Sequence, residues 1–80
     1  MKKHGEKMAR KVYHVVPSGE SWLVKLSGEV LSKHYHKDNA VTEAVRLAKA
    51  SQPSQVLVHR RDGTFEYEYT YGQDPERYPG

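Results

Sequence analysis

Residues 56–71, with the sequence VLVHRRDGTFEYEYTY, decide the fold of this 80-residue chain. They form two runs in which apolar and polar side chains alternate, and Asp62-Gly63 joins the two runs. Because this dipeptide accepts the positive φ angles of a tight turn, it favours a two-residue turn between antiparallel strands. The register counted outward from that turn pairs Arg61 with Thr64, Arg60 with Phe65, His59 with Glu66 and Val58 with Tyr67.

Alternation along a strand sends neighbouring side chains to opposite faces of a sheet, so this hairpin has one apolar and one polar face. The apolar face contains Val56, Val58, Phe65, Tyr67 and Tyr69. The polar face contains Leu57, His59, Glu66 and Glu68. We therefore predict a sheet that is covered on one side only, with Tyr67 and Tyr69 in the core beneath a helix.

Three further strands and the covering helix are predicted upstream of the hairpin. Alternating β-branched and aromatic side chains mark strands at residues 11–16, 21–26 and 29–35, with turn-forming residues between them. Apolar residues then recur at helical spacing between residues 40 and 48. Asp38 or Asn39 is suited to cap the start of that helix, and Pro53 ends it. The predicted fold class is α+β, an antiparallel sheet in βββαββ order with one helix packed on one face.

Length and composition limit what the chain can be. Eighty residues make a single domain that buries only about three-fifths of its unfolded surface, and the absence of cysteine excludes disulfides and thiolate zinc sites. We assign residues 11–72 to the domain, residues 1–10 to a disordered basic tail and residues 73–80 to an extended C-terminal tail. With no long apolar run and no secretory signal, the expected location is cytoplasmic.

The positive charge of the chain is concentrated at its N-terminus. Residues 1–11 hold five of the thirteen lysines and arginines but only one of the ten acidic residues. The other 69 residues therefore carry eight basic and nine acidic side chains, a net charge of −1. Domain-wide basicity, the first sign of a nucleic-acid binder, is not present.

Several motifs resemble a family of small bacterial proteins catalogued as domain of unknown function 2188. They are Trp22-x-Val24, the helix alanines Ala44 and Ala48, Val56-x-Val58-His59-x-Arg61-Asp62-Gly63, and Tyr71-Gly72-x-Asp74-Pro75. The resemblance covers roughly residues 13–80, and the hairpin turn with the Tyr-Gly-x-Asp-Pro segment is its most specific part. It implies a stand-alone soluble bacterial protein and carries over no catalytic or binding residue.

Two groups of side chains are candidates for chemistry. His34 and His36, spaced two apart on a strand, have a geometry that zinc and copper sites use, with His14 or Asp38 as further ligands. The pair of His59 and Glu66 across the hairpin is a candidate general base. Exposed histidines and an ordinary cross-strand charge pair explain both patterns more simply, since the chain has no nucleophile motif and no phosphate loop. We predict no enzyme, no metal and no cofactor.

Two surfaces are candidates for binding. Lys25, Lys33, Arg60 and Arg61, with Tyr13 and His59, form a basic and aromatic patch suited to phosphates and bases. A three-stranded meander on a helix is also an architecture that lays strands in a DNA groove, which is an argument from fold analogy. The alternative surface is the exposed sheet face or edge, with Leu57, Tyr71 and Tyr78 as contacts for another protein. We favour a non-catalytic binding module, and a protein partner or self-association over a weak nucleic-acid-binding domain.

Overall fold

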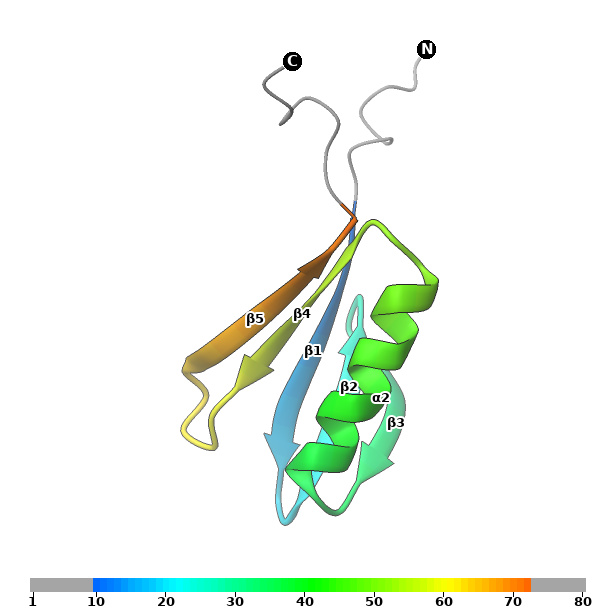
Figure 1. Ribbon diagram of the computed structural model, residues 1–80. Coiled ribbons are helices and arrows are strands. Elements are labelled where there is room, and N and C mark those ends of the chain that lie inside the picture. The colour runs from blue at the N-terminus through cyan, green and yellow to red at the C-terminus, as the bar shows by residue number, and fades with distance from the viewer. Residues whose placement is uncertain (1–9, 73–80) are drawn as a thin grey trace, which may run out of the picture.

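The elements follow the predicted order in the computed structural model, which describes residues 10–72 (Figure 1). The strands and helix are β1 (Lys11–Ser18), β2 (Ser21–Leu26), β3 (Glu29–His34), α2 (Lys37–Ala50), β4 (Ser54–His59) and β5 (Phe65–Tyr71). The predicted α+β class, with one helix packed on one face of a sheet, is confirmed. Both predicted tails, Arg10 apart, and Tyr78 lie outside the described residues.

The five strands form one sheet in the order β3-β2-β1-β4-β5. Three of the four strand pairs are antiparallel, and β1 and β4 are parallel. The parallel pair arises because α2 connects β3 to β4, and a connection through a helix returns the chain in the direction of the strand that it left. The two halves of the chain therefore meet at β1 and β4 in the middle of the sheet.

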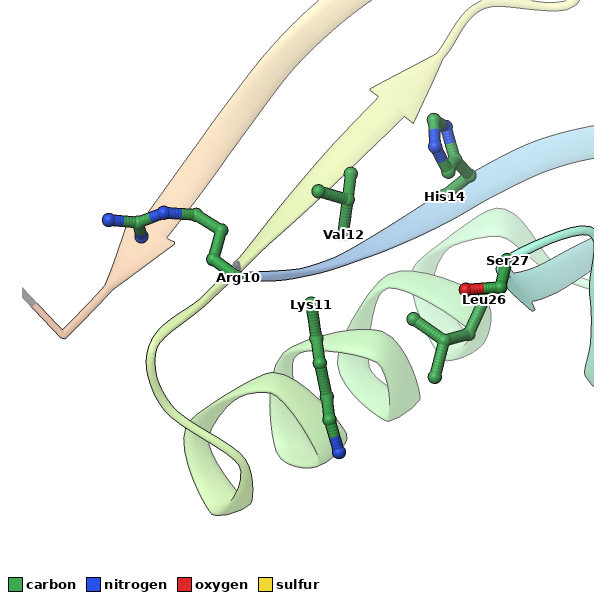
Figure 2. A pocket seen from close by; sticks show the side chains of 6 residues that line it. All are labelled: Arg10, Lys11, Val12, His14, Leu26 and Ser27. Atoms are coloured by element: carbon green, nitrogen blue, oxygen red, sulfur yellow. The ribbon is translucent and has the colours of Figure 1, made fainter. Parts of the chain in front are cut away.

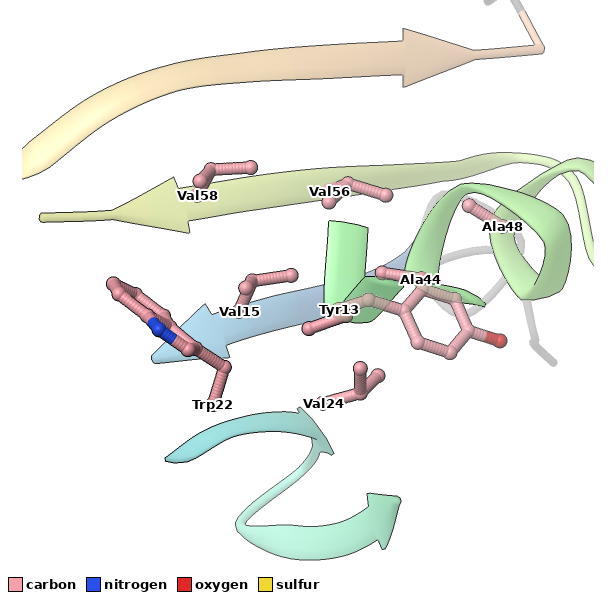
Figure 3. Close-up of a cluster of buried hydrophobic side chains, with 9 residues drawn as sticks. Tyr13, Val15, Trp22, Val24, Ala44, Ala48, Val56 and Val58 are labelled. Atoms are coloured by element: carbon pink, nitrogen blue, oxygen red, sulfur yellow. The ribbon is translucent and has the colours of Figure 1, made fainter. Parts of the chain in front are cut away.

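The core lies between the sheet and α2, and small side chains on the helix let the two layers approach closely. Ala40, Ala44 and Ala48 are completely buried against the sheet. The sheet contributes Tyr13 and Val15 from β1, Trp22 and Val24 from β2, and Val56 and Val58 from β4, as Figure 3 shows for most of this cluster. The predicted helix stripe and the predicted apolar face of β4 thus belong to the core, which side chains of β1 and β2 complete.

Polar groups close the C-terminal end of the helix onto the sheet. The hydroxyl groups of Tyr13 and Ser51 are 2.7 Å apart, and the Ser51 hydroxyl donates to the carbonyl of Leu47. The buried hydroxyl of Ser54 donates to the carbonyl of Ala48, which also accepts from the amide of Ser51, so the first residue of β4 is tied to the helix end.

The helix does not begin as predicted. Its N-cap is His36, which makes no side-chain capping hydrogen bond, and Asp38 lies within the first turn. An acidic side chain there still interacts favourably with the positive end of the helix dipole. The capping roles predicted for Asp38 and Asn39 are therefore wrong.

The prediction that Tyr67 and Tyr69 lie in the core beneath the helix is also wrong. Both point to the helix side of the sheet, because they pair with the inward residues Val58 and Val56. Their residues are nevertheless 42% and 38% exposed, since α2 lies over β1, β2 and β4 and barely reaches β5 (Figure 1). Tyr71, at the end of the strand, is partly buried and packs against the core.

The final hairpin turns through three residues instead of the predicted two. The amide of Gly63 donates to the carbonyl of Arg60, and the amide of Arg60 donates to the carbonyl of Thr64. Gly63 has a φ of +93°, as expected for the residue that follows a type I turn in a three-residue hairpin loop. Asp62 stabilises the loop by accepting hydrogen bonds from the amide and hydroxyl of Thr64, and these bonds lower the pKa of its carboxyl.

A bulge next to this loop restores the predicted pairing further along. His59 pairs with Phe65, the register then shifts, and Val58 pairs with Tyr67 as predicted. Glu66 is the extra residue and turns away from His59 to form an ion pair with Lys37 at the start of α2. The predicted His59–Glu66 pair therefore does not form.

Among residues 10–72, no helix is long and apolar enough to cross a membrane.

Candidate interaction surface on the open face of the sheet

The side of the sheet opposite α2 has no second layer within residues 10–72, and we call it the open face. Its position follows from the alternation of side chains, since the residues between the buried ones of each strand must point the other way. Figure 2 shows this for β1, where Val12 and His14 point away from the helix and Lys11 points toward it. The open face is therefore defined by register and not by the placement of any single side chain.

Strand pairing arranges the side chains of the open face in rows that cross the sheet. His14 is the register partner of Lys25 on β2 and of Leu57 on β4, and Leu57 is the partner of Glu68 on β5. We call Lys25, His14, Leu57 and Glu68 the central row. The second row lies nearer the hairpin loop. Lys33, Leu23 and Val16 pair across β3, β2 and β1, His59 and Phe65 pair across β4 and β5, and the two groups adjoin one residue beyond the pair of Val15 with Val58. A third, shorter row contains Val12, Gln55 and Thr70.

Apolar side chains occupy much of this face. Val12, Val16, Leu23 and Leu57 are each half-buried by their strand neighbours alone. Phe65 is 61% exposed, and Val30, which pairs with Lys25 at the β3 edge, is 51% exposed. An antiparallel sheet with one solvated face usually alternates apolar and polar residues cleanly, so apolar side chains in several strands make the open face a candidate contact surface.

Two histidines meet near the middle of the open face. The Nδ1 atom of His14 lies 3.1 Å from the Nε2 atom of His59, and the ring of Phe65 packs on His59 with the ring centres 4.8 Å apart. The second ring nitrogen of His59 lies 3.4 Å from the carbonyl of Gly63. Burial lowers the pKa of His14, and the neighbouring His59 and Lys25 lower it further, so the central row holds a neutral imidazole at neutral pH.

A hollow of about 440 Å³ opens beside His14, at the end of the sheet where β1 begins and β2 ends (Figure 2). Its lining consists of Arg10, Lys11, Val12, His14, Leu26 and Ser27. This lining holds no carboxylate, and its one imidazole is that of His14. Within residues 10–72 no group of three or more potential metal ligands forms either.

The predicted basic patch is divided between the two sides of the sheet. Lys25 and Lys33 share the open face on β2 and β3. Arg61 instead lies over the ring of Trp22, 4.8 Å from its centre, and donates to the carbonyl of Gly19. Arg60 donates to the hydroxyl of Thr64 and the carbonyl of Phe65 within the hairpin loop.

The predicted protein contacts are likewise placed on different surfaces. Leu57 lies in the central row of the open face, between His14 and Glu68. Tyr71 lies on the helix side, where the Lys49 ammonium is 5.9 Å from the centre of its ring. Of the two that lie within residues 10–72, Leu57 belongs to the open face and Tyr71 does not.

The histidines singled out as metal candidates are separated by the end of β3. His34 hydrogen-bonds the hydroxyl of Ser32 on the helix side of the sheet, whereas His36 is the N-cap of α2 and contacts the ring of Tyr35. Sequence reasoning missed the His14–His59 pair, because those residues are 45 positions apart and meet only through the pairing of β1 with β4.

A family model described as "Uncharacterized protein conserved in bacteria (DUF2188)" matches residues 13–71. No curated protein matches the chain, and no solved structure does. Several motif residues behind the resemblance have structural roles here. Trp22 is buried beneath Arg61, and Gly72 approaches the backbone of Pro53.

Proposed function

The chain belongs to the DUF2188 family of bacterial proteins, and from that premise we propose that it is a non-catalytic protein-interaction module whose open face binds another protein. The single observation that carries the proposal is the composition of that face. Half-buried aliphatic side chains occupy β1, β2 and β4, and the edge strands add the exposed Val30 and Phe65 together with the charged Lys33 and Glu68. An apolar centre within a polar rim is the usual anatomy of a protein interface.

The proposal is supported by the small core of the domain. The largest completely buried side chains are valines, and the helix contributes only alanines to the fully buried set. Covering the open face would add a second apolar layer of Val16, Leu23 and Leu57. Burial of such a side chain from full exposure stabilises by about 1.5–3 kcal/mol, and because these three are already half-buried, a partner adds only part of that for each.

Replacement of Leu57 by aspartate tests the proposal. Leu57→Asp puts a charge in the middle of the open face, whereas Tyr35→Asp makes the same kind of change at a 67% exposed residue beyond β3. We expect association with any protein partner, including the chain itself, to be lost with Leu57→Asp and retained with Tyr35→Asp. Association of wild type and both variants is measured by sedimentation and by capture of proteins from a bacterial lysate. If both variants fold and neither changes any association, the open face is not the binding surface.

A weak nucleic-acid-binding function is the second candidate, and one arrangement favours it. Lys25 and Lys33 share the open face, and the ion pair with Lys37 draws Glu66 away from it, so Glu68 is the acidic residue left in the central row. Phosphate contacts weaken steeply with salt. Titration of single- and double-stranded oligonucleotides at low and high salt, with wild type and Lys33→Glu, tests this candidate. Nucleic-acid binding that is unchanged by Lys33→Glu would exclude Lys33 as a phosphate contact.

A further inference from the structure

The central row is complementary to itself when it is reversed. Read across the sheet from β2 to β5, it is Lys25, His14, Leu57 and Glu68, a cation at one end, a carboxylate at the other and two packing residues between. We infer that the protein partner of the open face is a second copy of this chain, related by a two-fold axis that runs between β1 and β4. This inference rests on the proposed function and names the occupant of its surface.

Such an axis runs parallel to the strands. Rotation about it reverses the order of the strands and leaves the position of each residue along the strand direction unchanged, so each row of one copy meets the same row of the other. With the axis midway between β1 and β4, Lys25 lies opposite the partner's Glu68. His14 then lies opposite the partner's Leu57, and each contact occurs twice.

The second row fits the same axis. It places Leu23 opposite the partner's Phe65 and Val16 opposite the partner's His59, which covers the exposed ring of Phe65 with an aliphatic side chain. Lys33 lies outside the overlap, because the outermost strand of the partner's sheet, β5, lies opposite β2 and no strand of the partner lies opposite β3. Two aligned sheets about 10 Å apart form the ordinary core of a β-sandwich, so the dimer has a familiar architecture.

The extent of the overlap sets the strength expected of the dimer. The overlap spans four strands about 4.8 Å apart and three rows about 6.8 Å apart, which gives a projected area of about 400 Å² on each copy. Typical stable interfaces bury about 800 Å² of accessible surface per partner. The accessible surface of protruding side chains exceeds the projected area of the sheet, but this interface is still at the small end. We therefore expect a reversible dimer with a dissociation constant in the micromolar range or weaker.

Acid should dissociate this dimer. In the overlap, His14 is covered by the partner's Leu57 and is surrounded within its own chain by Lys25 on β2, His59 on β4 and Arg10 beside the shared hollow. Protonation of His14 would place a further cation among these groups and beneath an apolar side chain. Neutral His14, favoured by the direction of its pKa shift, is compatible with that position.

Charge reversal tests the inference. Lys25→Glu and Glu68→Lys each create two like-charge contacts per dimer, so each variant alone should self-associate at least about tenfold more weakly than wild type. An equimolar mixture of the two variants should form a heterodimer, because the new glutamate of one variant meets the new lysine of the other across the axis, and the second contact is the native pair of Lys25 with Glu68. Lys33→Glu is the matched control on the same face and should leave self-association unchanged. Sedimentation velocity over a concentration series and native mass spectrometry of the mixture measure these outcomes, and circular dichroism confirms that each variant is folded.

The outcomes separate this inference from the proposed function. Recovery in the mixture supports the two-fold axis. A wild-type chain that stays monomeric throughout, yet captures another protein in a Leu57-dependent manner, overturns the inference and leaves the proposed function standing. A dimer that is insensitive to Lys25→Glu and Glu68→Lys also overturns it. If no association of any kind depends on Leu57, both fall.

Discussion

Replacement of Gly72 by alanine should destabilise the domain far more than the same change at Gly63. Both glycines have φ angles that L-residues rarely adopt, +82° and +93°, so both substitutions incur a backbone cost of about 1–2 kcal/mol. They differ in their surroundings. A Cβ atom at Gly63 meets nothing within 4 Å, whereas one at Gly72 lies 3.0 Å from the Cα atom of Pro53 and 3.1 Å from the Cβ atom of Gln52.

Relief of that contact requires the end of β5 to move away from the segment that joins α2 to β4. Overpacking of this kind costs about 1–3 kcal/mol, so we expect about 2–5 kcal/mol in total for Gly72→Ala and about 1–2 kcal/mol for Gly63→Ala. The lower unfolded-state entropy of alanine applies equally to both and cancels in the difference. In a domain of this size each kcal/mol lowers the melting temperature by roughly 4–8 °C.

Thermal and urea denaturation, followed by circular dichroism and by the fluorescence of Trp22, measures both variants against wild type. Equal losses of stability at the two positions would contradict the close approach of Gly72 to Pro53. A neutral Gly72→Ala would contradict both that contact and the positive φ angle.

Three further predictions concern named side chains. Arg61→Ala should destabilise the fold by about 1–2 kcal/mol and shift Trp22 fluorescence to the red, because it removes a cation from the indole ring and a hydrogen bond to Gly19; unchanged fluorescence would count against the contact. Because folding lowers the pKa of His14, the unfolded chain takes up the proton first as the pH drops, so the free energy of unfolding should fall below about pH 6.5. His14→Gln should remove that part of the pH dependence, as measured by urea titrations at several pH values. Leu57→Asp should destabilise the monomer by only about 1–2 kcal/mol and leave it folded, since Leu57 is half-buried on the uncovered side of the sheet and the new aspartate faces Glu68; global unfolding would show that Leu57 belongs to the core.

The final hairpin shows how far the sequence predicts this fold. Alternation correctly assigned Val56 and Val58 to the inner face and paired Val58 with Tyr67. The predicted loop length was nevertheless wrong, and the pairing survived because the bulge at Glu66 compensates for the third loop residue. A bulge leaves no mark in an alternating pattern, so the placement of Phe65 and Glu66 could not be read from it.

The tyrosines of β5 illustrate a second limit. The pattern gave their face correctly, but burial depends on how much of the sheet one helix covers. A helix is about 10 Å across and strands are about 4.8 Å apart, so a single helix covers two or three strands of five. Alanines at its contact positions bring it close to β1, β2 and β4, and Tyr67 and Tyr69 on the outermost strand remain exposed.

The candidate site was less predictable than the fold. Leu57 was assigned to an exposed face by alternation, but the central row requires the parallel pairing of β1 with β4, which joins residues more than forty positions apart. From the sequence, Arg61 was placed in the basic patch together with its neighbour Arg60. In the fold it lies on Trp22, a contact that depends on the approach of the β1–β2 turn to the final hairpin loop.

Intermolecular nuclear Overhauser effects test the central claim most directly. In an equal mixture of isotope-labelled and unlabelled chains, filtered spectra detect only contacts between copies. The two-fold arrangement predicts contacts from the methyl groups of Leu23 on β2 to the ring of Phe65 on β5, residues that two intervening strands separate within one chain. Contacts that instead involve α2 or the exposed tyrosines of β5, or their complete absence at concentrations where the chain sediments as a dimer, would contradict it.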